Sequence, residues 1–144
     1  QPPTAAPGAQ YTTFESKQQA CDRGELAVCT EVGRAYLKGE GIAQDKERGL
    51  TYLRKGCDGK VPASCFALGV NQLMSGDGAN DVIRGVANIK QACDDKHADA
   101  CQFLGSIADG IIQIPGMQPN RELANSYYQK ACDYGNQASC SLIK

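Results

Sequence analysis

Eight cysteines are the residues of this 144-residue chain with the clearest capacity for chemistry. In each of four pairs the second cysteine follows the first by eight residues, and the pairs start 36, 36 and 39 residues apart. The pairs are Cys21/Cys29, Cys57/Cys65, Cys93/Cys101 and Cys132/Cys140. Structural zinc sites favour cysteines separated by about two to four residues, and redox-active dithiols favour C-x-x-C. Because neither spacing occurs, we expect disulfides, no bound metal and no cofactor.

Other polar residues offer weaker candidates for chemistry. Ser141 and Lys144 match S-x-x-K, the nucleophile motif of penicillin-recognising enzymes, but the partner K-T-G is missing and Lys144 is the last residue. His97 lies between two paired cysteines and is expected to be a solvated turn histidine. An aspartate directly follows the first cysteine of each pair, at a position typical of turn and cap residues. These aspartates are Asp22, Asp58, Asp94 and Asp133. We therefore predict no catalytic residue.

The segments between cysteine pairs have the apolar period of helices. Leu50, Leu53 and Cys57 recur at i, i+3 and i+7, and the segments after each second cysteine show a similar face. Glycines at 39–41 and 76–78 mark turns between such helices, and the third connection, 110–120, is longer and contains prolines. Each period therefore predicts an αα-hairpin, and the fixed period of about 36 residues predicts an all-α repeat array.

The cysteine pair of each period must span a tight turn. Two residues eight apart on one continuous helix would be separated by about 12 Å along the axis, too far for a disulfide. A turn between them brings the two helix ends together. Pairing at i and i+8 is then the most economical of the about 105 pairings that eight cysteines allow.

A glycine recurs four residues after the second cysteine, inside the expected helix, at Gly33, Gly69 and Gly105. Glycine there costs about 1 kcal/mol relative to alanine, so its recurrence indicates close approach of another helix. Gly49 and Gly85 are expected to have the same role.

The segment from Val32 to Ile42 resembles the Sel1-like repeat, a tetratricopeptide-related helical solenoid. It carries that motif's apolar-Gly step, a tyrosine three residues later and a G-x-G-hydrophobic loop. The paired cysteines resemble the cysteine-rich secreted subgroup described in Helicobacter, and the resemblance covers residues 11–144. It implies a right-handed αα-hairpin solenoid in which each turn is stapled by a disulfide. Gln72 and Ala108 replace the tyrosine in the second and third units, which suggests a locally reshaped surface.

Four disulfides would persist in an oxidising compartment. We expect a periplasmic or secreted protein, with the mitochondrial intermembrane space as the alternative. Residues 1–10 are rich in proline and alanine and are expected to form a flexible tether, behind a cleaved signal peptide, behind a lipid-modified cysteine, or as an ordinary frayed end. No stretch approaches the roughly 18 apolar residues of a transmembrane segment.

The net charge of −1 and the scattered charges give no basic face for nucleic acid. A protein or peptide partner is expected instead, bound by a monomer. On the helices that follow each pair, the side chains opposite the cysteine face are predicted to line a concave groove that runs from charged to apolar. The alternative is that they form the core between repeats. The predicted groove residues are Glu31, Arg34, Lys38, Val70, Met74, Phe103 and Ser106.

The sequence therefore predicts a non-enzymatic, extracytoplasmic binding module, with a periplasmic immunity or inhibitor protein as a concrete form. The rival prediction is a weak β-lactamase, or a protein that binds penicillin or peptidoglycan fragments, as suggested for the Helicobacter relatives. The loop 111–119, where the repeat is interrupted, is a further candidate for specificity.

Overall fold

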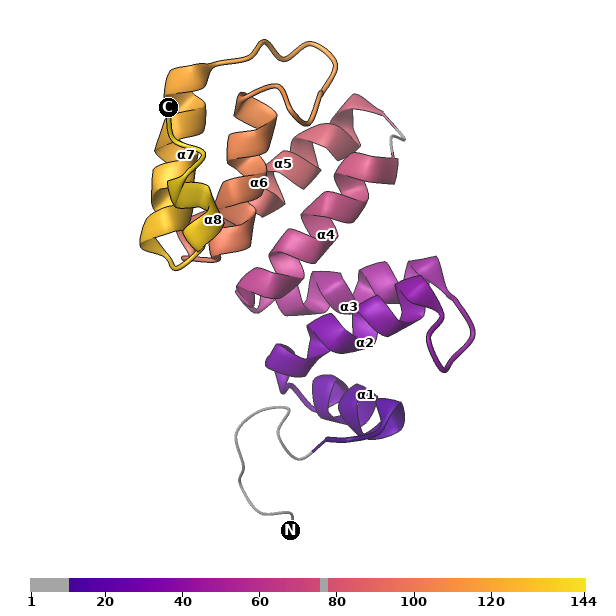
Figure 1. Ribbon diagram of the computed structural model, residues 1–144. Coiled ribbons are helices and arrows are strands. Elements are labelled where there is room, and N and C mark those ends of the chain that lie inside the picture. Colours follow the sequence, from indigo (N-terminus) through magenta and orange to yellow (C-terminus); the bar gives the residue numbers. More distant parts are fainter. Residues whose placement is uncertain (1–10, 76–77) are drawn as a thin grey trace. The chain divides into compact units, whose positions relative to one another are not determined.

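The computed structural model describes residues 11–75 and 78–144, and this part of the chain contains helices and no β-strand (Figure 1). The helices are α1 (Phe14–Asp22), η1 (Leu26–Val28), α2 (Cys29–Lys38), α3 (Lys46–Asp58), α4 (Pro62–Ser75), α5 (Ala79–Asp94), α6 (Ala98–Ala108), α7 (Arg121–Asp133) and α8 (Gln137–Cys140). Among the described residues, no helix has the length and hydropathy needed to cross a membrane. The predicted tether, 1–10, and two residues of the predicted turn at 76–78 lie outside the described part.

The predicted order of helices is confirmed. The helices α1, α3, α5 and α7 each end one residue after the first cysteine of a pair, at one of the recurrent aspartates. All four aspartates are exposed at the start of the turn, as expected.

Each turn between paired cysteines has the same left-handed backbone residue. It lies three residues after the first cysteine and is Gly24 (φ 105°), Lys60 (φ 66°), Lys96 (φ 69°) or Gly135 (φ 108°). Its N–H donates to the carbonyl of the first cysteine, as from Lys60 to Cys57 (2.9 Å), and the next N–H donates to the residue before that cysteine. This arrangement satisfies carbonyls that a helix end leaves unpaired, so each helix stops at a defined residue.

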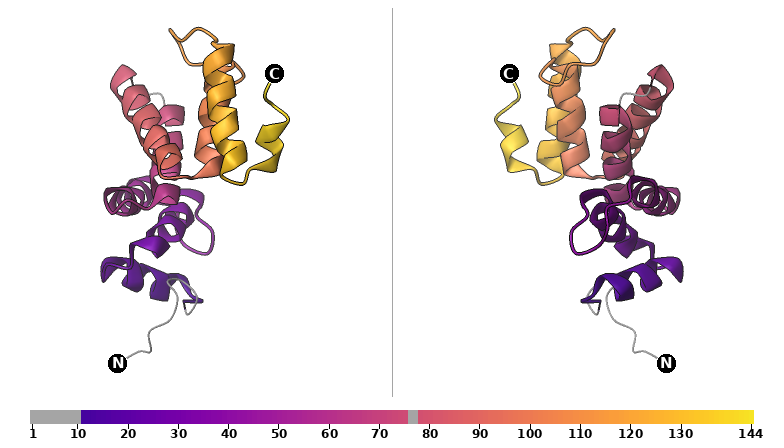
Figure 2. Two further views of the ribbon diagram at one scale, coloured as in Figure 1. Left: turned by 90° about the vertical axis from the view of Figure 1, so that its left-hand side faces the viewer. Right: turned by 90° about the vertical axis from the view of Figure 1, so that its right-hand side faces the viewer.

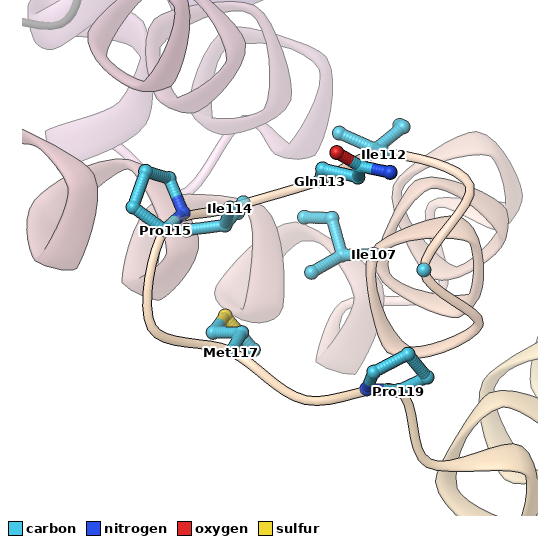
Figure 3. Close-up of a pocket in the computed structure, with 8 residues that line it drawn as sticks. Ile107, Ile112, Gln113, Ile114, Pro115, Met117 and Pro119 are labelled. Atoms are coloured by element: carbon cyan, nitrogen blue, oxygen red, sulfur yellow. The ribbon is translucent and has the colours of Figure 1, made fainter.

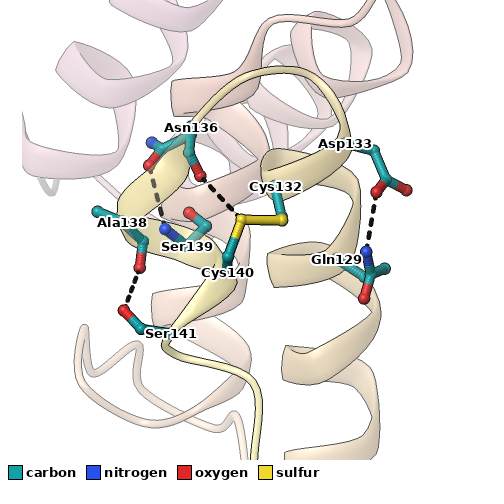
Figure 4. Close-up of a disulfide and its surroundings, with 8 residues drawn as sticks. All are labelled: Gln129, Cys132, Asp133, Asn136, Ala138, Ser139, Cys140 and Ser141. Carbon is teal, nitrogen blue, oxygen red and sulfur yellow. Dashed lines mark hydrogen bonds between the residues drawn. A yellow bond between two sulfur atoms is a disulfide. The ribbon is translucent and has the colours of Figure 1, made fainter.

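Four disulfides join the cysteines as predicted, each across one of these turns. The Cα–Cα distances are 5.1 Å for Cys21–Cys29, 4.4 Å for Cys57–Cys65, 4.7 Å for Cys93–Cys101 and 4.9 Å for Cys132–Cys140. Figure 4 shows the Cys132–Cys140 disulfide beside Asn136. The Asn136 side chain accepts a hydrogen bond from the Ser139 N–H and caps the start of α8. The prediction of αα-hairpin repeats stapled at their turns is thereby confirmed.

The chain forms two compact units, residues 1–68 and 69–144, which divide within α4. The core of the first unit contains Val28, Val32 and Tyr36 with the Cys21–Cys29 disulfide, and Phe14 and Tyr52 pack against it. In the second unit Tyr128 of α7 is fully buried with Ala108 and Ala124. Each unit thus has its own apolar core, built from helices that are close in sequence.

The recurrent glycines allow the close helix contacts that the sequence predicts. A methyl group at Gly69 would lie 2.6 Å from the Gly85 carbonyl oxygen, and one at Gly33 would lie 2.9 Å from that of Gly49. At Gly105 the neighbour is instead the ring of Tyr128, at 2.5 Å. The glycines therefore allow α2 to pack on α3, α4 on α5 and α6 on α7.

Two serines at equivalent repeat positions have different surroundings. Both Ser64 and Ser139 precede the second cysteine of a pair and are fully buried. The Ser64 hydroxyl is hydrogen-bonded to the buried Thr30 hydroxyl at 2.6 Å, which links α2 to α4. The Ser139 hydroxyl has no hydrogen-bond partner among the described residues.

Candidate functional site

The predicted groove residues of the first unit gather at one small pocket. Glu31, Arg34 and Lys38 project from one side of α2 and are exposed. Together with Phe14 and Lys17 of α1 they border a pocket of about 320 Å³. The Lys17 ammonium lies 2.6 Å from the Glu31 carboxylate, so the other charged groups at the pocket are Arg34, Lys38 and Glu40. The pocket therefore suits a polar or charged group of a partner.

An aromatic cluster behind this pocket holds α1 in place. The Phe14 ring meets the Tyr36 ring edge to face at 5.2 Å, and the Tyr36 ring stacks on the Tyr52 ring at 5.8 Å. The Gln18 amide donates to both tyrosine hydroxyls, at 2.9 and 3.0 Å. Burial raises the pKa of Tyr52. These contacts fix the α1 residues that border the pocket.

The predicted groove residues of the second unit differ in exposure. Met74 is 74% exposed, whereas Val70, Phe103 and Ser106 are half-buried. Ser106 lies beside Tyr128 of α7, whose ring packs on Gly105, so part of this predicted face packs within the α6–α7 pair. The role of these residues in partner binding stays a prediction.

A larger apolar pocket lies in the second unit, on residues that the predicted groove did not include. It has a volume of about 780 Å³, and we name it the α5–loop groove. One wall is a face of α5 with Leu73 of α4 beside it, and the other is the loop between α6 and α7. The lining residues are Leu73, Gly78, Ala79, Val82, Ile83, Val86, Ala87, Ile114, Pro115, Gly116 and Met117. None of them is charged. Ile83 is 65% exposed and Met117 46%, so large apolar side chains reach solvent here.

The loop wall is held at both of its ends. The Asn120 N–H donates to the Ala108 carbonyl at 2.7 Å, and the Arg121 guanidinium pairs with the Asp109 carboxylate at 2.8 Å. Figure 2 shows the loop leaving the ends of the adjacent helices α6 and α7. Short polar contacts therefore join the two ends of the loop at its base.

The interior of the loop is apolar as well. Ile114 is 7% exposed, and Ile107 of α6 points into the loop between Ile112 and Pro119 (Figure 3). A second pocket of about 390 Å³ lies here. Because Ile114 and Ile107 anchor the loop from beneath, Met117 is left at the edge of the α5–loop groove.

Comparison with the equivalent helices shows that the repeat does not require an apolar face here. Counting back from the first cysteine of each pair, Val82 and Ile83 correspond to Lys46 and Glu47 of α3 and to Arg121 and Glu122 of α7. Likewise, Val86 and Ala87 correspond to Leu50 and Thr51 and to Asn125 and Ser126. The sequence carried this signal, which a repeat-by-repeat comparison of helices before the cysteine pair could have found.

The residues considered for catalysis are not brought together. The Ser141 hydroxyl donates to the Ala138 carbonyl at 2.9 Å, and the Lys144 backbone is paired with the Asn125 side chain at both its N–H and its carbonyl. His97 directly precedes α6 and is half-buried. Within residues 11–75 and 78–144, no group of three or more His, Cys, Asp or Glu side chains could hold a metal ion.

A family model described as Sel1 repeat matches residues 27–60 and 98–136, together slightly more than half of the chain. No curated protein matches the sequence.

Solved structures similar to this one include two proteins of the same fold. A Sel1 repeat protein from Oxalobacter formigenes is 23% identical, with a TM-score of 0.72 over 90% of this chain and 96% of that chain. A protective antigen present in uropathogenic Escherichia coli strains, with an SLR fold, is 18% identical, with a TM-score of 0.77 over 90% of this chain and 27% of that chain. An immunity protein from Pseudomonas aeruginosa reaches a TM-score of only 0.43 at 19% identity, over 88% of this chain and 59% of that chain, which supports no conclusion.

Proposed function

This chain belongs to the Sel1 repeat family, and we propose that it is a non-enzymatic module that binds a protein partner in an oxidising, extracytoplasmic compartment. The Sel1 repeat fold is typical of protein interaction scaffolds, and arrays of helical hairpins offer extended binding surfaces.

The α5–loop groove is the observation that carries the proposal. Buried apolar residues are explained by a core, but Ile83 and Met117 are large, exposed and grouped around a pocket. Clustered exposed apolar groups of this kind mark interaction sites. Since α3 and α7 carry mainly charged or polar residues at the same repeat positions, stability of the array does not account for the cluster.

The four disulfides support the proposed compartment. Three of them are formed by buried cysteines and the fourth by half-buried ones, so they contribute to the core as well as to the turns. Disulfides of this kind persist in the periplasm, outside the cell or in the mitochondrial intermembrane space. We propose the periplasm or the cell exterior.

A periplasmic immunity or inhibitor protein is the specific form that we propose within this class. A stapled array with a charged pocket on α2 and an apolar groove on α5 has the two kinds of surface with which such a protein could cover a secreted toxin. Co-expression with the captured partner should then reduce the toxicity of that partner.

Photo-crosslinking in the producing cell tests the proposed function. A photoreactive residue is introduced at Ile83, at Met74 or at Arg34, with Thr51 on the exposed side of α3 as a control position. We expect a discrete protein adduct from Ile83 and none from Thr51. Absence of a discrete adduct from all three test positions would refute partner binding through these surfaces.

A further inference from the structure

We propose that the α5–loop groove binds one amphipathic α-helix of the partner, with its apolar face on α5 and acidic side chains beside Arg84 and Lys90. This inference rests on the proposed function, because it names the kind of segment that the partner contributes.

The shape of the α5 wall favours a helix. Ala79, Ile83 and Ala87 recur every four residues, and Val82 and Val86 form a parallel row beside them. Rows of this spacing are the ridges that pack into the grooves of a second helix. The lining stretch from Ala79 to Ala87 spans about 12 Å, or about two helical turns, which matches apolar anchors at i, i+4 and i+7. The alternation of alanine with larger side chains leaves holes between the ridges.

α5 already packs another helix on its opposite side. There Gly85 meets Gly69 of α4 and Ile89 is fully buried. The face that lines the groove is therefore a second apolar face on one helix, and it lacks the covering helix that the first face has in α4. The loop residues Ile114–Met117 cover only its edge.

The charges around the groove define the partner further. Arg84 flanks Ala87 on the side away from Val86, whereas Lys90 continues the row of Val82 and Val86 one turn beyond the wall. Asp81 is the single acidic residue between 79 and 90. Arg84 and Lys90 are exposed, and neither is in an ion pair with any residue of 11–75 or 78–144. The opposite wall is formed by uncharged loop residues. Charge complementarity therefore favours acidic residues on the bound helix at the two places where it approaches Arg84 and Lys90.

A second copy of this chain is a less suitable occupant. Two copies joined through their α5 faces would bring together four cations, from Arg84 and Lys90, against two Asp81 carboxylates, and this excess of like charge disfavours association. The proposal therefore commits to a different polypeptide with the opposite sign of charge.

The test uses a phage-displayed library of random 16-residue peptides, selected on the full, disulfide-intact chain. Selected peptides are synthesised with a fluorescent label, and their affinity is measured by anisotropy for the unchanged chain, Ile83→Glu and Ile111→Glu. The two isoleucines are matched, since they are 65% and 66% exposed, but Ile111 does not line the groove. We expect peptides with apolar residues at helical spacing and with acidic residues. They should bind Ile83→Glu at least tenfold more weakly and Ile111→Glu within twofold of the unchanged chain.

The charge contribution is tested by Arg84→Glu combined with Lys90→Glu. The selected acidic peptides should lose at least tenfold in affinity for this variant, and their Glu→Lys counterparts should regain it.

Two results would overturn the proposal. One is a set of selected peptides whose apolar residues lack helical spacing, or whose affinity Ile83→Glu leaves unchanged. In that case the proposed partner-binding function would still stand if crosslinking yields an adduct. The other is a concentration-dependent dimer in sedimentation analysis that Ile83→Glu abolishes, which would assign the groove to a second copy. If crosslinking yields no adduct while helical peptides do bind the groove, the proposed function fails and the recognition of a helix stands.

Discussion

Replacing Ser64 with alanine should destabilise the first unit more than a surface change would. The Ser64 and Thr30 hydroxyls are 2.6 Å apart, and the two residues are 0% and 4% exposed. The substitution removes a hydrogen bond worth about 1 kcal/mol net and leaves the Thr30 hydroxyl buried without a partner, at a cost of about 1–3 kcal/mol. Because the Thr30 hydroxyl can recover part of its loss by turning toward a helix carbonyl, we expect the free energy of unfolding to fall by about 2 kcal/mol.

The equivalent substitution at Ser139 should have the opposite sign. Its hydroxyl is fully buried and has no partner among the described residues, so Ser139→Ala removes an uncompensated polar group. We expect a change between zero and a gain of about 1 kcal/mol. The two variants remove the same atom from the same repeat position, which makes each the control of the other.

Urea unfolding of the disulfide-intact protein, followed by far-UV circular dichroism, measures both changes. Amide hydrogen exchange in α2 and α4 assigns the Ser64 effect to its own unit. The double variant Thr30→Val/Ser64→Ala should be more stable than Ser64→Ala, since it leaves no orphaned hydroxyl. Equal effects of Ser64→Ala and Ser139→Ala, or strict additivity in the double variant, would refute the reasoning.

Three further predictions concern the turns and the core. Limiting dithiothreitol should reduce Cys132–Cys140 before the other disulfides, because these two cysteines are half-buried and the other six are buried. Alkylation followed by mass mapping gives the order of reduction, and earlier labelling of any other cysteine pair would count against the prediction. Lys60→Gly should raise the free energy of unfolding by about 0.5–1 kcal/mol, since a lysine at φ 66° is strained and glycine is not, whereas Gly24→Ala should lower it by a similar amount in the same urea assay. Burial raises the pKa of Tyr128 above its usual value of about 10. The neutral phenol therefore contributes fully to the free energy of unfolding below about pH 10, and this contribution is lost as the pH rises further. Tyr128→Phe should lose stability less steeply above pH 10 than the unchanged chain, and an unchanged slope would contradict this assignment.

The hairpins could be predicted from the sequence because the cysteine period marks the same turn four times. The distance limit requires a turn between Cys21 and Cys29, and between their three equivalents, which makes this pairing the most economical one; the resemblance to Sel1-like repeats implies the same pairing. The close contacts of Gly33 and Gly69 were likewise predictable, because glycine destabilises a helix interior and its recurrence there indicates that a neighbouring helix packs against it. The left-handed conformation of Lys60 and Lys96 was not, because lysine gives no local signal for it and the stapled turn imposes it.

The candidate site was only partly predictable. The helical period placed Arg34 and Lys38 on the exposed side of α2, but it gave no means of knowing that Ser106 lies beside Tyr128 of the neighbouring helix α7. The α5–loop groove depends on a loop that returns toward α5, and the conformation of a proline-containing connection is set by tertiary contacts such as that between Asp109 and Arg121. The break in the period did indicate that this loop is special.

The closure of the α6–α7 loop at its base has a consequence for how this protein can diversify. Asn120 and Ala108, with Arg121 and Asp109, join the two ends of the loop independently of what lies between them. The Cys93–Cys101 and Cys132–Cys140 staples lie at the other ends of α6 and α7. Insertions, deletions or grafted peptides between residues 111 and 119 should therefore leave the hairpin folded. The loop is a natural position for altering what the protein recognises, in evolution and in engineering alike.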